Sequence, residues 1–151
     1  MREIKIDIGA LMPIIEEKLA RGGEVIFSPN GISMIPTLKP GVDTAVLVAA
    51  PDKLKKYDIA LFRAKNGQYV LHRVIRTGES YTFIGDSRFE CERDIQREAI
   101  IALCIARVRD GKRARLDSCA SRAFARFWHA TRPIRRFCTG VKRKIRSLSI
   151  K

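Results

Sequence analysis

A single serine in a turn-forming stretch is the first residue of this sequence whose surroundings suit catalysis. Ser33 lies in the run Gly31-Ile32-Ser33-Met34-Ile35-Pro36-Thr37-Leu38, and Pro29-Asn30-Gly31 breaks the apolar segment before it. A serine hydroxyl becomes a nucleophile only when a base removes its proton and backbone N–H groups stabilise the oxyanion. A turn rich in Gly and Pro can expose the hydroxyl beside such N–H groups. By itself, the run also fits an ordinary turn serine.

A histidine in an apolar strand could supply the base that Ser33 needs. The chain has two histidines, and His72 lies in the segment Val70-Leu71-His72-Arg73-Val74-Ile75-Arg76. Strand alternation places His72 on the same face as Val70 and Val74. An imidazole in such surroundings needs a partner, because its charge and tautomer depend on its neighbours. The alternative is a structural histidine satisfied within the core.

The segments around these two residues predict a mainly β, α+β chain with an antiparallel, barrel-like sheet. Leu11, Ile15 and Leu19 recur at helical spacing within a helix over 8–20, which Asp7 would cap and Gly22-Gly23 would end. The segment 99–109 could be strand or helix, and its β-branched residues favour a strand. The other expected strands are 24–28, 43–49, 58–64, 68–76 and 80–84.

Charge divides the chain into two parts, which we take as a catalytic domain over 1–111 and a basic helical extension over 112–151. Of the net charge of +14, the extension carries +12, from 13 Lys and Arg and the single acid Asp117, which leaves 17 bases and 15 acids before it. The sequence predicts an amphipathic helix that restarts at Thr131-Arg132-Pro133. One face is expected to carry Phe124 and Phe127, with Ala120, Thr131, Ala123 and Trp128 beside them.

The basic extension has several possible partners. Its helices could pack on the sheet with a solvated basic face, or lie on an anionic membrane surface with aromatic anchors. An acidic protein or peptide is a third partner that the charge would suit, and only charge favours nucleic acid. The expected membrane anchors are Phe124, Phe127, Trp128 and Phe137.

Cysteine usage and the N-terminus point to the cytoplasm, with the extension peripheral at the inner membrane surface. Cys91, Cys104, Cys119 and Cys138 are widely spaced and are expected to be reduced structural thiols. The N-terminus lacks the pattern of a secretory signal, and no segment has the roughly 18 consecutive apolar residues typical of a spanning helix. We expect no cofactor and no metal site.

Four ordered motifs within about 24–109 resemble signal peptidase I and its LexA-type relatives. The resemblance implies a β-rich catalytic domain with Ser33 as nucleophile and His72 as general base, as in the histidine-type branch. It also makes the backbone N–H of Ser33 an oxyanion donor. The motifs are Ser33-Met34-x-Pro36-Thr37-Leu38, Tyr57-Asp58-Ile59-Ala60-Leu61-Phe62, His72-Arg73-Val74-Ile75 and Gly85-Asp86.

The resemblance leaves the third catalytic residue open. In histidine-type enzymes an acid beyond the Gly-Asp pair orients the imidazole, as a triad requires. Glu92 and Asp94 both fit that position, whereas Asp86 would shape the loop or assist from the side. Met34 and Pro36 flank the serine and are the expected ligand-binding contacts.

Two departures from the family pattern bear on the function. Gly31 stands where many signal peptidases have a serine that assists the oxyanion hole, so one donor is missing. No membrane anchor is expected, and the 32 residues before Ser33 hold no helix-turn-helix, which argues against a DNA-binding repressor. The sequence predicts a serine peptidase that cleaves a peptide or a precursor protein. The alternative is a non-catalytic domain of the same fold that binds a peptide or a membrane surface.

Overall fold

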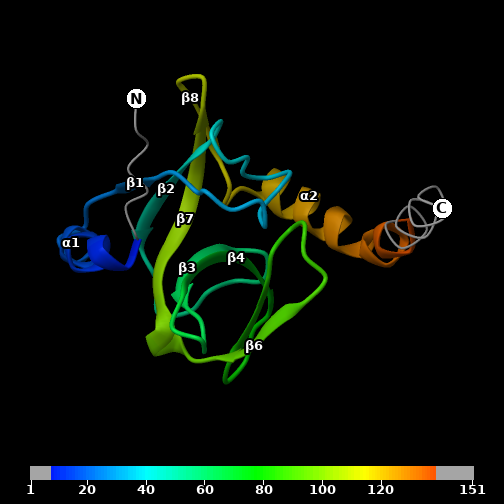
Figure 1. The fold of residues 1–151 in the computed structure, drawn as a ribbon, viewed down its shortest axis with the longest axis horizontal. Coiled ribbons are helices and arrows are strands. Elements are labelled where there is room, and N and C mark those ends of the chain that lie inside the picture. The colour runs from blue at the N-terminus through cyan, green and yellow to red at the C-terminus, as the bar shows by residue number, and fades with distance from the viewer. Residues whose placement is uncertain (1–7, 139–151) are drawn as a thin grey trace, which may run out of the picture.

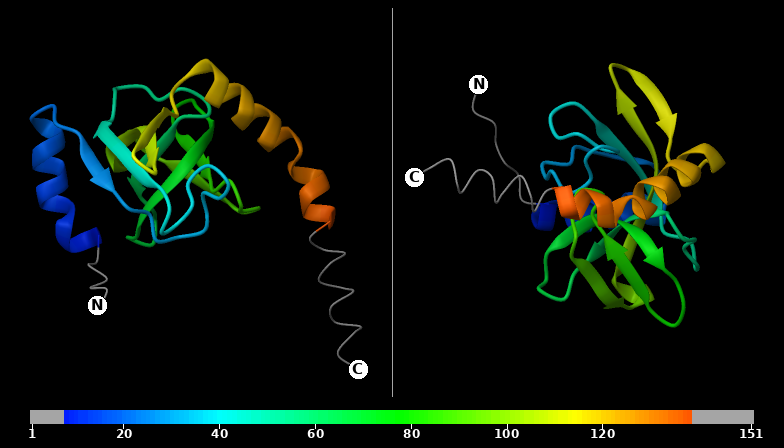
Figure 2. Two further views of the ribbon diagram at one scale, coloured as in Figure 1. Left: turned by 90° about the horizontal axis from the view of Figure 1, so that it is seen from above. Right: turned by 90° about the vertical axis from the view of Figure 1, so that its right-hand side faces the viewer.

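The protein is one antiparallel sheet with a helix on each of two opposite sides, as a computed structural model shows (Figure 1). The structure describes residues 8–138. Helix α1 (Ile8–Ala20) and helix α2 (Cys119–Ala130) lie on opposite sides of the sheet (Figure 2). A further helical segment, residues 132–138, follows α2 after a turn at Thr131.

Helix α1 covers the predicted range and is followed by the two glycines that were expected to end it. Its apolar residues Met12, Ile15 and Leu19 are buried against the sheet. Gly22 has φ +76°, a left-handed conformation that favours glycine, and its N–H donates to Leu19 O. The N–H of Gly23 donates to Lys18 O, which completes a Schellman end. The predicted cap Asp7 lies outside the described residues.

The sheet has eight strands, and every pairing in it is antiparallel. The order is β1-β2-β7-β3-β4-β5-β6, with β8 paired to β7. The predicted α+β class is therefore confirmed. The predicted barrel-like closure is not, because β1 and β6 end the path and do not pair with each other. The strands are β1 (Val25–Phe27), β2 (Thr44–Ala49), β3 (Ile59–Arg63), β4 (Tyr69–Arg76), β5 (Tyr81–Ile84), β6 (Cys91–Ile95), β7 (Ile100–Arg109) and β8 (Lys112–Arg115).

Apolar side chains form two separate cores on the curved sheet. One core joins α1 to β2, β7 and the segment after Ser33, and it contains Met34, Leu38 and Leu61. The other core lies among β3, β4, β5 and β6 around the stacked rings of Phe62 and Phe83. Because side chains alternate along a strand, β4 contributes to both cores, and successive residues of β4 face different surroundings.

The start of the basic extension differs from the prediction. Residues Lys112–Arg115 are not helical: they form β8, whose register with β7 is set by a turn at Asp110-Gly111. The boundary drawn at 111 therefore falls between two paired strands, and the helix begins only at Cys119. The division into two domains stays a prediction.

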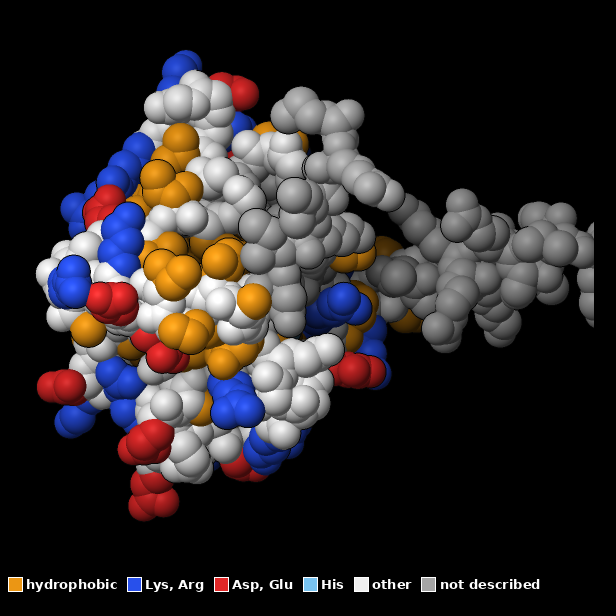
Figure 3. Space-filling view, turned by 60° about the vertical axis from the view of Figure 1, so that its left-hand side comes forward, with side chains coloured by type: hydrophobic (Ala, Val, Ile, Leu, Met, Phe, Trp, Pro, Cys, Tyr) orange, Lys and Arg blue, Asp and Glu red, His pale blue; other side chains and the backbone are white. Residues whose placement is uncertain are grey.

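Three further features concern helix hydropathy, the cysteines and the apolar surface. In the described part of the chain, no helix is both long and apolar enough to cross a membrane. The four cysteines form no disulfide, and burial raises the pKa of the Cys104 thiol to about 12. The space-filling view shows apolar side chains gathered in the middle of one face, with charged residues around them (Figure 3).

Candidate active site

The turn that carries Ser33 is held by buried residues on its C-terminal side. The N–H of Ile35 donates to Ile32 O, and the N–H of Leu38 donates to Met34 O. Met34 is only 1% exposed and packs in the core with Leu38, so it anchors the turn. Its role as a ligand contact stays a prediction. Pro36 is half-buried and follows a cis peptide bond, and Ser33 itself is half-buried.

The segment after β5 fixes Ser33 from the other side. The N–H of Ser87 donates to Ser33 O at 2.9 Å, and Ser87 Oγ donates to Ile32 O at 2.8 Å. Gly85 is packed directly on the serine: a Cβ at Gly85 would lie 2.7 Å from Ser33 O and 3.0 Å from Ser33 Cβ. Real Cβ contacts are not that short, so only glycine allows Ser33 to come this close. The Gly-Asp motif and the serine motif thus meet in space.

His72 lies beside this contact. Arg73 of β4 is opposite Ile84 of β5, so extending the antiparallel register by one residue places His72 opposite Gly85. Opposed residues point to the same face, with Cβ atoms about 4.5–5.5 Å apart. The predicted nucleophile therefore packs on the residue that follows β5, the strand paired with the one that carries the predicted base.

The register of β6 completes that face with Glu92. Glu92 is opposite Phe83, which shares the face of His72, and Glu92 Oε1 lies 3.9 Å from His72 Nδ1. Nδ1 is buried and has no hydrogen-bond partner among the described residues. Asp94 points elsewhere, at 3.6 Å from Lys65 Nζ, with its side chain 73% exposed. Of the two acids left open by the sequence, Glu92 is the one that faces the imidazole.

Asp86 belongs to a separate buried network on the opposite face of β4. Arg73 Nε donates to Asp86 Oδ1 at 2.7 Å, and Arg73 Nη2 donates to Asp86 Oδ2 at 2.8 Å. Thr37 Oγ1 donates to Asp86 Oδ2 and accepts from Arg73 Nη2, while Arg73 Nη1 donates to Tyr57 O. Both carboxylate oxygens are used, so Asp86 joins the Ser33 turn to β4 and does not orient His72.

Sequence reasoning named Arg73 and Thr37 only as motif positions and gave them no role. Their signal was present nonetheless. A lone arginine between the buried residues of a strand needs a buried acid as its partner, and Asp86 follows a strand that would neighbour it. What the sequence could not supply was the face that each residue occupies.

Burial dominates the electrostatics of His72. The pKa of His72 is lowered to about 4, chiefly by burial and also by the charge of Arg88, while the charge of Asp86 opposes both effects. The imidazole is therefore neutral at neutral pH, which is the form that can accept a proton. Arg88 reaches the site because its Cγ packs beside Gly85.

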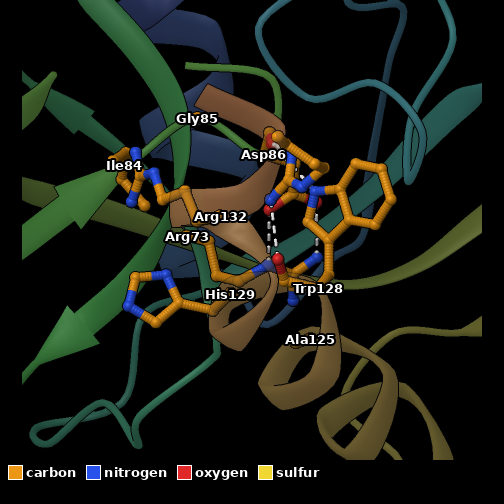
Figure 4. Close-up of a pocket in the computed structure, with 9 residues that line it drawn as sticks. Arg73, Ile84, Gly85, Asp86, Ala125, Trp128, His129 and Arg132 are labelled. Carbon is orange, nitrogen blue, oxygen red and sulfur yellow. Dashed lines mark hydrogen bonds and ion pairs between the residues drawn. The ribbon is translucent and has the colours of Figure 1, made fainter. Parts of the chain in front are cut away.

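Helix α2 holds the Gly85–Ser87 segment from outside, which the sequence did not predict. Trp128 Nε1 donates to Asp86 O at 2.8 Å, and the Arg135 guanidinium lies 3.8 Å over the Trp128 ring. Figure 4 shows Trp128 and Arg73 converging on Asp86. The cavity between them is about 10 Å³, which leaves room for no more than one water molecule. Trp128 is thus packed against the body, and its role as a membrane anchor stays a prediction.

Two features of the site are incomplete in this conformation. Within the described part of the chain, no hydrogen bond joins Ser33 Oγ to the imidazole. A Cβ at Gly31 would have Ser33 Oγ, at 4.0 Å, as its nearest contact, so the space for the missing oxyanion donor is open. Catalytic hydrogen bonds often tighten only when substrate binds. Among residues 8–138, no group of three or more His, Cys, Asp or Glu side chains could hold a metal ion.

Comparison with known proteins gave no match to a family model, to a curated protein or to a solved structure.

Proposed function

We propose that this protein is a serine peptidase of the signal peptidase and LexA-like type, with Ser33 as nucleophile, His72 as general base and Glu92 as the acid that orients it. One observation carries the proposal. His72 and Glu92 share a face of the sheet, with Nδ1 and Oε1 3.9 Å apart, and Ser33 packs on Gly85 beside them. Four motifs that resemble this superfamily in the sequence supply the residue types that such a reaction needs.

The proposed reaction follows from the positions of these groups. Glu92 keeps the proton of the neutral imidazole on Nδ1, so Nε2 accepts the proton of Ser33 Oγ. The oxygen attacks a peptide carbonyl, and the N–H of Ser33 donates to the oxyanion. His72 then protonates the leaving amine, which leaves an acyl-enzyme on Ser33. A water molecule, deprotonated by His72, releases the acid product and restores Ser33.

Glu92 suits its role because its side chain is more exposed than that of His72. Its side chain is 36% exposed, whereas that of His72 is 9% exposed. A shift of about 1 Å would bring Oε1 within hydrogen-bond distance of Nδ1. The neutral state of His72 at pH 7 and the proximity of a partly solvated acid are what a triad of this type requires. The substrate in this proposal is a peptide or a precursor protein.

The test is cleavage of a synthetic peptide library by the full chain, read by mass spectrometry of new termini. We expect Ser33→Ala and His72→Ala each to lower the rate by about a thousandfold or more. Glu92→Gln should lower it by about tenfold or more, whereas the matched variant Asp94→Asn should cleave like the parent. Cleavage by Ser33→Ala at the parental rate would overturn the proposal.

A second candidate is a non-catalytic domain that binds a peptide with the same face. It is favoured by Gly31, which removes an oxyanion donor, and by the absence of a bond between Ser33 Oγ and His72 in the described structure. The two candidates differ in one measurement. A peptide that binds the parent and the Ser33→Ala variant equally, and is cleaved by neither, identifies the binding domain.

A further inference from the structure

The outer side of helix α2 and of the helical segment 132–138 is apolar. Its large side chains are Phe124, Phe127, Ile134 and Phe137, which are 43%, 65%, 66% and 73% exposed. Ala123 and Ala130 are exposed with them. We call these six residues the outer stripe. In Figures 1 and 2 no other described element lies beyond α2 on the side that faces away from the sheet.

The stripe faces outward because polar side chains attach the helix to the body. Arg122 Nη2 donates to Asp58 Oδ1 at 2.7 Å, and Trp128 Nε1 donates to Asp86 O at 2.8 Å. Ala125 is the buried residue of α2. An amphipathic helix in a globular protein usually turns its apolar face to the core. Here three separate polar contacts, the third from Arg132 to Arg88 O, hold the opposite orientation.

The charge around the stripe is of one sign. Arg126 and Arg136 are exposed on the same two helical segments. After Asp117 the chain contains ten bases and no acid to its end: Arg122, Arg126, Arg132, Arg135, Arg136, Lys142, Arg143, Lys144, Arg146 and Lys151. A partner must therefore offer both an apolar interior and negative charge.

We propose that the outer stripe binds the surface of an anionic lipid membrane. Phenylalanine and isoleucine side chains would enter the boundary between headgroups and acyl chains, and the arginines would remain among anionic headgroups. Nucleic acid would explain the arginines but leaves four exposed apolar side chains without a function. A second copy of this chain would bring two stripes together but would also oppose two sets of like charges.

Binding by this face fixes the orientation of the Ser33 site. Because Trp128 and Asp86 are joined, and Asp86 neighbours the Gly85 that supports Ser33, the stripe and the site belong to one connected unit. The membrane would be bound by the helix and not by the face that carries His72. The docking inference does not depend on peptidase activity, since it rests only on the outer stripe and on the charge around it.

Flotation of the full chain with vesicles tests the proposal. We expect binding to vesicles of phosphatidylcholine containing about one third phosphatidylglycerol, and at least tenfold weaker binding to phosphatidylcholine alone. Phe127→Ser with Phe137→Ser should weaken binding to the anionic vesicles by at least tenfold. The matched control is Ile14→Ser with Ile26→Ser, whose side chains are 64% and 70% exposed on α1 and β1. This control should bind within about twofold of the parent.

Each other result would overturn the proposal. Equal loss in the Ile14/Ile26 variant would show that the membrane contacts another face. Absence of vesicle binding, with a dimer in sedimentation that the Phe127/Phe137 variant abolishes, would assign the stripe to a second copy. Absence of vesicle binding, with oligonucleotide binding that this variant retains, would assign the extension to nucleic acid. Circular dichroism and melting curves would establish that the variants are folded.

Discussion

Arg73 and His72 are neighbours in β4, but they differ in whether their buried polar groups have hydrogen-bond partners. Arg73 is 3% exposed, and its Nε and both terminal nitrogens donate to Asp86, Thr37 or Tyr57. His72, on the other face, is 9% exposed, and its Nδ1 has no hydrogen-bond partner among the described residues. A buried polar group without a partner costs stability, whereas a fully bonded pair holds its geometry.

The difference in hydrogen bonding gives the two residues different roles: Arg73 supports the structure, whereas His72 can accept a proton. The Arg73 guanidinium makes four hydrogen bonds within the protein, so this network fixes the Ser33 turn and is committed to structure. The imidazole of His72 retains unused capacity, and its neutral form can accept a proton. A site of this kind needs both faces of the sheet. On the saturated face, which carries Arg73, the polar groups are hydrogen-bonded within the protein. On the unsaturated face, which carries His72, a polar group is still available.

The largest expected effect is a loss of stability when Arg73 is removed from the saturated face. Arg73→Met leaves the Asp86 carboxylate buried without its cation, so we expect the free energy of unfolding to fall by about 3–5 kcal/mol. Urea denaturation measures this loss. The control is Arg115→Met, which breaks an ion pair with Asp117 in which the arginine is 74% exposed, and it should leave the midpoint nearly unchanged. Similar small effects of both substitutions would contradict the assigned role of Arg73.

The unsaturated face should be visible in the pH dependence of stability. The pKa of His72 is about 4 in the folded protein against 6.5 as its ordinary value, so the unfolded chain binds this proton first. The associated stability is complete above pH 6.5 and is lost as pH falls toward 4, by about 3 kcal/mol. Urea midpoints across this range should therefore drop more steeply for the parent than for His72→Asn. The same slope in both proteins would mean that His72 is not desolvated.

A smaller effect is expected on kcat, from substitutions at Gly31. Gly31→Ser places a hydroxyl near Ser33 Oγ, where nothing else lies within 4 Å, and we expect kcat to rise by about tenfold or more as an oxyanion donor is restored. Gly31→Ala adds the carbon without the hydroxyl and should give no gain. Equal rates for the two variants would show that this position does not reach the oxyanion.

Much of the fold could be predicted because the apolar pattern is regular. Helix 8–20 has the predicted bounds, and the six predicted strands each end within two residues of β1, β2, β3, β4, β5 and β7. The missed strands have no such pattern. All four residues of Lys112–Arg115 are exposed and one of them is apolar, and Cys91–Ile95 carries three charged residues on the last strand of the sheet. Their pairing with β7 and β5 makes them strands, and pairing is a property of the register.

The candidate site shows the same limit. Ser33 and His72 could be named from motifs, and Glu92 could be named only as one of two alternatives, because one residue of register decides which side chains of β6 face β4. Packing of α2 on the sheet is one of the predicted alternatives, but the outward direction of its apolar face could not be predicted. Amphipathicity favours an inward apolar face, but contacts from Arg122 and Trp128 to Asp58 and Asp86 hold the helix the other way.

The contact between Gly85 and Ser33 has a consequence for redesign of this protein. Any side chain at position 85 would push the serine away, so Gly85 and the two residues after it should be kept unchanged in a library intended to alter specificity. Ile32, next to the serine and 59% exposed, is free of that constraint. New recognition can therefore be selected at Ile32, on the serine side of the contact, while the opposite side keeps the proposed nucleophile in place.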